Sequence, residues 1–274
     1  MKKVKKVLNN NVLLVVETFG PDKILIGPGI GYGLKAGTFF TDNDKVQQVF
    51  VLSEAENRTN FDSLVRNIDP QIIAVVEEEL QVIQNYLAEP LNEGVHVTLI
   101  DHVAGAIDRY KKGILFTNPF SDLMKFAYQE EYDLTSKMID RINKTFSVQL
   151  NENENAILAM HINAARTNKS VMESTDLADM VYTTVQEFYA MKGIEIDRNS
   201  FAYQRLLIHC KFVFERILNH QPIKNELTSL IIGQYPEEYN KLKILLTGIL
   251  EDYDVQVSDD EIAYLILHAR RIME

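Results

Sequence analysis

The sequence lacks several features that mark common classes of protein. It has a single cysteine, Cys210, among 274 residues, so it supports neither a disulfide framework nor a cysteine-based zinc site. No apolar run approaches the roughly 20 residues that span a bilayer, so no stable membrane insertion is expected. The basic N-terminus reaches the polar residues 9–11 before any long apolar core, which argues against a secretory signal. A cytoplasmic protein is therefore the expectation.

The charge is distributed unevenly along the chain. The formal net charge is −11 at pH 7, but residues 1–35 carry six lysines against Glu17 and Asp22. Residues 57–274 carry 21 basic and 33 acidic side chains. A small basic head therefore precedes a large acidic body, and only the head is suited to a polyanion.

The head has the pattern of β-strands. Short apolar runs lie at residues 4–8, 12–16, 23–26 and 46–52, and turn residues separate them. They predict a small antiparallel sheet of about four strands. A core of this size is marginal by itself, so dimerisation would help the head to fold.

From about residue 57 the apolar residues recur at helical spacing instead. Asp69 and Asn151 are predicted helix starts, and Ser258 followed by Glu261 forms a predicted capping box. The body is therefore expected to be mostly helix.

The body also contains an internal repeat. His102 and His161 are 59 residues apart, and so are His209 and His268. A shift of 107 residues superimposes the two pairs without a gap and gives 16 identities in the 63 positions of 99–161. This indicates two homologous helical domains, each with a matched pair of histidines.

Four matched histidines have several possible uses. A single histidine is most often a hydrogen-bonded core residue, but core packing does not require imidazole at the same two places in both copies. A metal site would need converging ligands, and the sequence has no His-Glu-x-x-His or similar motif, so no metal is expected. A nucleophilic triad is also not indicated, because Cys210 and its neighbour His209 would point in different directions on a helix. The remaining use is a phosphate acceptor, since a neutral imidazole nitrogen is a good nucleophile near pH 7.

The glycine-rich segment 27–33 has two readings. It lacks the third glycine of a dinucleotide loop and the Gly-Lys-Ser/Thr of a nucleotide-binding loop, so it is either a tight turn or a backbone that lies against a ligand. In the second reading Tyr32 could stack on a base, and the asparagines at 9–11 could bind base edges or phosphates.

These motifs together resemble a known family. Residues 4–12 and 26–33 are similar to the co-antiterminator RNA-binding domain of the BglG/SacY/LicT transcriptional antiterminators. The segments around the four histidines resemble the two phosphotransferase regulation domains that follow that domain in the family. Residues 118–120 and 235–239 are similar to the glucose-type branch.

The resemblance implies a multidomain fold, in which a small antiparallel β RNA-binding domain precedes two homologous all-α helical bundles. The expected domains are residues 1–56, 65–168 and 172–274. It also implies a homodimer that binds a messenger-RNA hairpin overlapping a terminator in the leader of a sugar-utilisation operon. The residues that this places on the RNA, directly or by shaping the turn, are Lys6, Asn9, Asn10, Asn11, Gly27, Pro28, Gly29 and Tyr32. Pro28 departs from the family, which often has a basic residue there, and this puts RNA affinity in doubt.

The resemblance further implies that His102, His161, His209 and His268 accept phosphoryl groups. The donors would be a sugar-specific enzyme II subunit and the phosphocarrier protein HPr. Asp101 precedes the first histidine whereas Ile208 holds the matching position, so the two copies are expected to use their histidines differently. No catalytic residue, cofactor or DNA partner is expected. The alternatives are a DNA-binding activator, a phosphorylation-controlled interaction module with the same domains, or a phosphotransfer enzyme.

Overall fold

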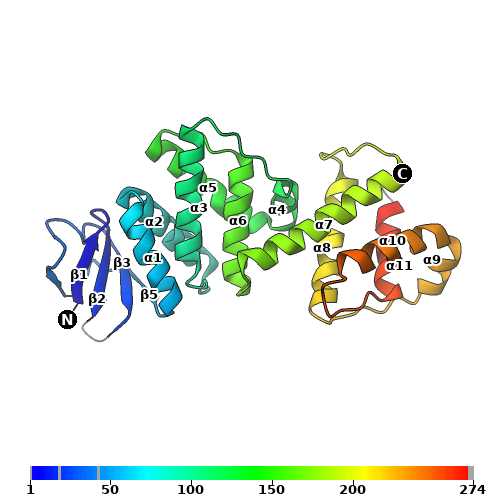
Figure 1. The fold of residues 1–274 in the computed structure, drawn as a ribbon, viewed down its shortest axis with the longest axis horizontal. Helices are drawn as coiled ribbons and strands as arrows, with labels where there is room; N and C mark the ends of the chain where they lie inside the picture. Colours follow the sequence, from blue (N-terminus) through cyan, green and yellow to red (C-terminus); the bar gives the residue numbers. More distant parts are fainter. Residues whose placement is uncertain (1, 18–19, 42–43, 271–274) are drawn as a thin grey trace. The chain divides into compact units, whose positions relative to one another are not determined.

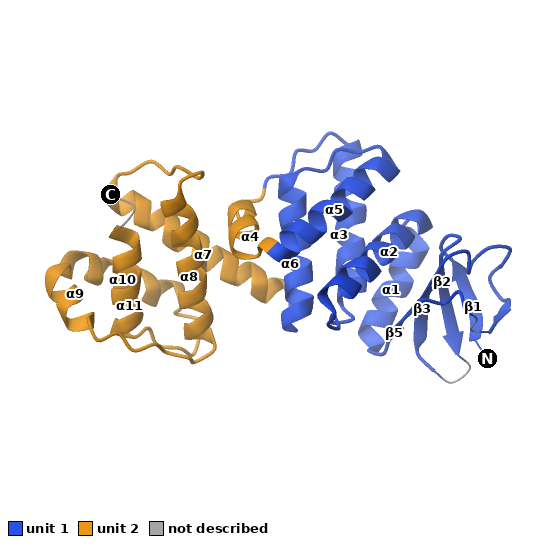
Figure 2. Ribbon diagram, turned by 180° about the vertical axis from the view of Figure 1, so that it is seen from behind, with its two compact units in different colours: residues 1–117, 130–170 blue, residues 118–129, 171–274 orange. Residues whose placement is uncertain are grey.

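The structure is a computed structural model that describes residues 2–17, 20–41 and 44–270 (Figure 1). The chain divides into two compact units (Figure 2): residues 1–117 with 130–170, and residues 118–129 with 171–274. The predicted first residue of the chain's first domain and the last four of its third lie outside the described residues. An N-terminal sheet is followed by helices alone, which confirms the predicted fold class.

The N-terminal sheet has five antiparallel strands in the order β4-β1-β2-β3-β5. The strands are β1 (Lys2–Val7), β2 (Val12–Glu17), β3 (Asp22–Ile26), β4 (Phe39–Phe40) and β5 (Gln48–Leu52). Four of them fall on the predicted runs. The sequence pattern does not predict β4, because two residues are too few to show an alternation of period two.

The strand β2 is apolar throughout because both of its faces are covered. Val12 and Leu14 pack against helices α1 (Ala55–Asn67) and α2 (Pro70–Leu87) in one apolar cluster. Leu13 and Val15 pack in a second cluster on the opposite face, with Ile30 from the loop after β3. Each such side chain contributes about 1.5–3 kcal/mol when it is fully buried. The small sheet therefore obtains its core from helices of the same chain, so its size does not require a second copy.

The remaining helices form two copies of one arrangement. The first copy consists of α2, α3 (Val95–Lys111), α4 (Ser121–Ala127), α5 (Gln129–Phe146) and α6 (Glu152–Thr167). The second consists of α7 (Val171–Lys192), α8 (Phe201–Leu218), α9 (Thr228–Gln234), α10 (Pro236–Ile249) and α11 (Asp259–Arg270). None of the helices in the described residues is both long and apolar enough to cross a membrane.

The predicted helix starts are confirmed by their caps. The Asp69 side chain accepts a hydrogen bond from the backbone N–H of Gln71, and that of Asn151 accepts one from Asn153. Ser258 Oγ accepts a hydrogen bond from the backbone N–H of residue 261 at 3.3 Å. These bonds satisfy backbone donors that the first helical turn leaves without an internal partner.

The segment around α4 is the main difference between the copies. Helix α9 packs on α10 and α11 of its own copy, whereas α4 packs on α8. Asp122 of α4 accepts a hydrogen bond from the Tyr203 hydroxyl at 3.2 Å and pairs with Arg198 at 3.3 Å. Residues 118–129 therefore belong to the second compact unit, and the units do not follow the three predicted domains, which stay a prediction.

Candidate functional site

The turn between β1 and β2 is fastened to the glycine loop that follows β3. Asn9 Oδ1 accepts a hydrogen bond from the backbone N–H of Asn11 at 2.7 Å, which closes the turn. Asn11 Oδ1 accepts one from the N–H of Gly29 at 3.0 Å, and the carbonyl of Asn11 accepts one from Gly27 at 2.9 Å. Two sequence segments 18 positions apart therefore form one connected surface, as expected for residues that act together.

The glycine loop is a turn in which two glycines are required. A Cβ atom at Gly27 would overlap the backbone carbonyl of Lys45, and Gly29 has a φ of +68° in the left-handed region. The tight-turn reading is therefore correct for the backbone. Pro28 is exposed between the two glycines, and the side chain of Tyr32 is 79% exposed. An exposed aromatic ring beside a fixed turn is available to stack on a ligand.

Helix α2 contacts the asparagine turn through one carboxylate. Glu78 Oε1 accepts a hydrogen bond from the Asn9 amide at 3.0 Å and another from the Asn11 amide at 3.3 Å. The other oxygen of Glu78 pairs with Arg141 of α5. An anionic oxygen from the helical region thus lies against the side-chain donors of the turn.

The other predicted RNA-binding residues divide between covered and open positions. The ammonium group of Lys6 donates a hydrogen bond to the backbone carbonyl of Val65 in α1. Asn10 is exposed, like Pro28 and Tyr32. The structure therefore brings all these residues to neighbouring loops or strand ends, but it holds Lys6 and two of the asparagines against α1 and α2.

The first pair of histidines lies between α3 and α6. The rings of His102 and His161 have centroids 5.5 Å apart. His102 Nε2 is 2.8 Å from Glu154 Oε2, and His161 Nδ1 is 3.1 Å from the hydroxyl of Thr98. Burial, together with the charge of the neighbouring His102, lowers the pKa of His161 to about 3. His161 is therefore neutral at pH 7 and retains one nitrogen lone pair.

Glu154 links the first pair to an arginine. Its carboxylate accepts hydrogen bonds from Arg109 Nη2 at 2.9 and 3.0 Å. Burial alone would raise the pKa of Glu154, but the hydrogen bonds from His102 and Arg109 outweigh it and lower the pKa below its usual range. An ionised carboxylate can only accept hydrogen bonds, so Nε2 of His102 carries the proton of that bond.

The second pair of histidines lies between α8 and α11 and is arranged differently. The rings of His209 and His268 stack, with centroids 3.5 Å apart. His209 Nδ1 is 2.9 Å from the hydroxyl of Tyr264. Arg216 pairs with the buried Glu261 at 2.6 and 2.8 Å, as Arg109 pairs with Glu154 in the first copy.

The arginine and glutamate of each copy were not assigned a role from sequence, although a signal for them exists. Arg109 and Glu154 are identical to Arg216 and Glu261 under the shift of 107 residues. Tyr264 gives no such signal, since its counterpart in the first copy is isoleucine. Repetition therefore finds what the two sites share and misses what distinguishes them.

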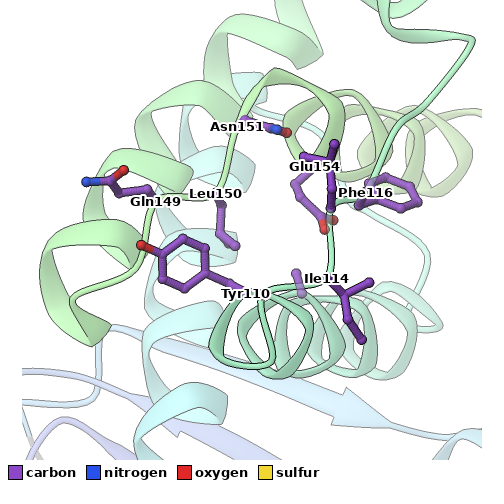
Figure 3. A pocket seen from close by; sticks show the side chains of 10 residues that line it. Tyr110, Ile114, Phe116, Gln149, Leu150, Asn151 and Glu154 are labelled. Carbon is purple, nitrogen blue, oxygen red and sulfur yellow. The ribbon is translucent and has the colours of Figure 1, made fainter.

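A cavity of about 250 Å³ opens beside the first pair (Figure 3). Glu154 and Phe116 lie on one side of it, and Gln149 and Tyr110 lie on the other. A corresponding cavity in the second copy is lined by Arg216 and Glu261. In both copies the buried glutamate of the histidine site thus also reaches a cavity wall.

Cys210 does not provide a competing nucleophile beside His209. Its side chain is 1% exposed, and burial raises the pKa of its thiol to about 12. The thiol is therefore protonated at pH 7, and the reactive thiolate is absent. The nucleophiles placed in pairs at these sites are the imidazoles.

The buried His161 predicts a pH dependence of stability. Its pKa is about 3 in the folded chain, whereas an unfolded histidine has a pKa of about 6.5. Below pH 6.5 the unfolded chain therefore binds the extra proton, so stability is fully present above pH 6.5 and falls as the pH falls towards 3. The slope from this residue approaches about 1.4 kcal/mol per pH unit.

Urea unfolding between pH 6.5 and about 5, above the range of most carboxyl groups, measures this slope. His161→Gln should reduce it, while His220→Gln, at an exposed position, should leave it unchanged. Equal slopes for the chain and the His161 variant would contradict the buried, neutral state of His161.

The chain matches two protein families over most of its length. Residues 2–59 match the CAT RNA binding domain, and residues 77–165 and 183–271 each match the PRD domain. The two PRD matches cover the two copies found by the internal repeat.

Similar full-length proteins and one solved structure carry the same name. The chain is 27% identical to "Protein GlcT" of Staphylococcus saprophyticus over 273 residues, which cover 99% of this chain and 97% of that protein. It is 28% identical over 274 residues to "Protein GlcT" of Staphylococcus aureus strain JH9, covering 99% and 96% of the two chains. The structure titled "Crystal structure of GlcT CAT-PRDI" aligns with a TM-score of 0.53 and 35% identity, covering 61% of this chain and 99% of the other.

Proposed function

Because the chain belongs to the family of transcriptional antiterminators that join a CAT RNA-binding domain to two PRD domains, we propose which of its residues carry out antitermination and how they are controlled. It is an RNA-binding antiterminator, regulated by phosphorylation from the sugar phosphotransferase system, and is similar to GlcT proteins. The proposed RNA is a hairpin with internal loops that overlaps a terminator stem in the leader of a sugar-utilisation operon.

The RNA contacts are proposed on the connected surface of the asparagine turn and the glycine loop. The observation that carries this is the hydrogen bond from Gly29 to Asn11, which fixes the side chain of Asn11 beside exposed Tyr32. Its amide can bind a base edge or a phosphate, and Tyr32 can stack on an unpaired base. Lys6 adds a positive charge for the phosphate backbone.

The reaction that these contacts drive is a change in RNA folding. The hairpin and the terminator share sequence, so a protein that binds only the hairpin shifts the equilibrium away from the terminator. A shift from 1:99 to 99:1 requires about 5.5 kcal/mol of differential binding. No covalent chemistry is needed, so we propose that the chain is not an enzyme. Two RNA-binding domains in a homodimer would supply this binding energy more readily than one.

In the arrangement seen here the RNA-binding groups are occupied. Glu78 holds the amides of Asn9 and Asn11, and a carbonyl of α1 holds Lys6. RNA would have to displace a carboxylate that occupies the position expected for an RNA phosphate. We therefore assign this arrangement of the first compact unit to the state that does not bind RNA.

The proposed switch is phosphorylation of His102, His161, His209 and His268. Each pair presents imidazole nitrogens next to a buried arginine–glutamate pair. A phosphoryl group adds nearly two negative charges, so it competes with the glutamate for the arginine. The proposed donors are a sugar-specific enzyme II subunit and HPr.

The test is binding of the full chain to a looped RNA hairpin, a fully paired RNA hairpin and duplex DNA of matched length. We expect preference for the looped RNA, and a loss of about tenfold or more for Asn11→Ala or Tyr32→Ala, because base–aromatic stacking contributes about 1–3 kcal/mol. Tyr86→Ala is the control, since Tyr86 is also exposed, at 63%, but lies on α2. Equal binding to all three nucleic acids, with a steep loss in salt, would reduce the head to a nonspecific polycation.

A further inference from the structure

The two histidine pairs differ in which ring nitrogen is engaged. In the first copy the contact to a neighbouring acceptor is made by Nε2 of His102, at 2.8 Å from Glu154. In the second copy it is made by Nδ1 of His209, at 2.9 Å from the Tyr264 hydroxyl. The residue that causes this difference is Tyr264, because isoleucine at the matching position of the first copy has no hydroxyl.

Tyr264 lies at the centre of the second site. Its ring centroid is 5.6 Å from that of His209 and 4.4 Å from that of His268. The guanidinium of Arg216 lies 5.1 Å from the same ring. The stacked histidine rings leave the rotation of His209 to be set at its edge, and the hydroxyl of Tyr264 contacts that edge.

The nitrogen that carries the proton decides which nitrogen can attack phosphorus. A neutral imidazole has one N–H and one lone pair, and a hydrogen bond at one nitrogen selects between the two tautomers. In the first copy the Glu154 carboxylate keeps the proton on Nε2 of His102, so the lone pair is on Nδ1.

We propose that Tyr264 positions His209 as a phosphoryl acceptor by accepting a hydrogen bond from its Nδ1–H, so that the second copy is modified on Nε2 and the first on Nδ1. In the transfer, the lone pair of Nε2 forms the new P–N bond. The bond from phosphorus to the donor protein breaks, and its electron pair stays on the donor atom. The proton on Nδ1 remains shared with Tyr264 through this step. The proposal rests on the proposed phosphorylation of His209 and adds the nitrogen that is used and the residue that selects it.

One consequence is a difference in donor choice. A donor protein must bring its phosphoryl group to opposite edges of the two imidazoles. One donor geometry therefore does not fit both copies equally well. The sequence difference between Asp101 and Ile208 points to unequal use, but neither side chain makes the contact that distinguishes the two rings; Tyr264 and Glu154 do.

The first test is nuclear magnetic resonance of the unmodified full chain with ¹⁵N-labelled histidine, with signals assigned by His209→Gln and His102→Gln. We expect a protonated Nδ1 in His209 and a protonated Nε2 in His102. Tyr264→Phe removes only the hydroxyl and should return His209 to a mixture of tautomers, while Tyr239→Phe, which removes a hydroxyl bonded to Asp259, should not. A proton on Nε2 of His209, or no change in Tyr264→Phe, would overturn the proposal.

The second test is phosphorylation of the same proteins by purified components of the sugar phosphotransferase system, with the isomer identified from phosphorus–nitrogen coupling. We expect Nε2-phosphohistidine at 209 and a rate about tenfold lower in Tyr264→Phe, the loss expected for one hydrogen bond. The rate at His102 should be unchanged. The same isomer in both copies would overturn the role of Tyr264. The expected tautomer without any phosphorylation of His209 would instead overturn the proposed modification site, and with it the use assigned to Tyr264.

Discussion

Replacing Glu78 with alanine is expected to raise the affinity of the full chain for the looped RNA hairpin by about 30-fold, since two hydrogen bonds of about 1 kcal/mol each are no longer broken when RNA binds. These are the bonds from the amides of Asn9 and Asn11 to Glu78 Oε1. The variant also removes a negative charge from the path of the RNA backbone, which acts in the same direction. Titration of labelled hairpin at fixed salt measures the change.

The matched control for Glu78 is Gln84, which also lies on α2 and contacts the sheet. Gln84 accepts a hydrogen bond at 3.4 Å from Gln48, which is not among the proposed RNA contacts. Gln84→Ala should therefore leave RNA affinity nearly unchanged. A similar gain in both variants would mean that general loosening of α2, rather than the carboxylate, controls access. A loss of affinity in Glu78→Ala would contradict the occupied-surface account.

Replacing both histidines of the first copy with alanine is expected to abolish most of the effect of phosphorylation on RNA binding by that copy. A phosphoryl group on His102 would lie close to the Glu154 carboxylate, which contacts the unmodified ring at 2.8 Å. Two unit charges about 5 Å apart repel by roughly 3 kcal/mol at an effective dielectric constant of about 20. Modification is therefore incompatible with the present contact between His102 and Glu154, and the site must rearrange.

The measurement compares hairpin affinity before and after treatment with the phosphotransferase components. In the unaltered chain we expect a change of about tenfold or more, and in His102→Ala/His161→Ala only the part that the second copy contributes. His220→Ala is the control, because His220 is exposed and has no counterpart in the first copy. An unchanged response in the double variant would remove the first copy from the switch.

The repeat shows how far sequence reasoning reaches in this chain. Histidines matched at a constant shift are found by counting, and the structure brings both pairs together. His96 has no such match, and it is buried against Glu77 at 2.8 Å, which is the ordinary fate of a single histidine. The recurrence of a residue in both copies therefore separates candidate site residues from core residues.

What the sequence does not reveal depends on packing between distant segments. The contact of Glu78 with the asparagine turn joins residues 69 positions apart, and no local pattern encodes it. The position of α4 on α8 is a second example, because the matching helix α9 has the same length and a different neighbour. Both features follow from tertiary contacts that are neither periodic nor repeated.

The central claim is that residues of the N-terminal sheet, freed from α2, hold a messenger-RNA hairpin against a terminator. The most direct measurement is single-round transcription through a template in which such a hairpin overlaps a terminator, with the full chain and its Asn11→Ala and Glu78→Ala variants. The account predicts that read-through rises with the full chain, rises at lower protein concentration with Glu78→Ala, and returns to the protein-free value with Asn11→Ala. Read-through that does not differ between Asn11→Ala and the unaltered chain would contradict it.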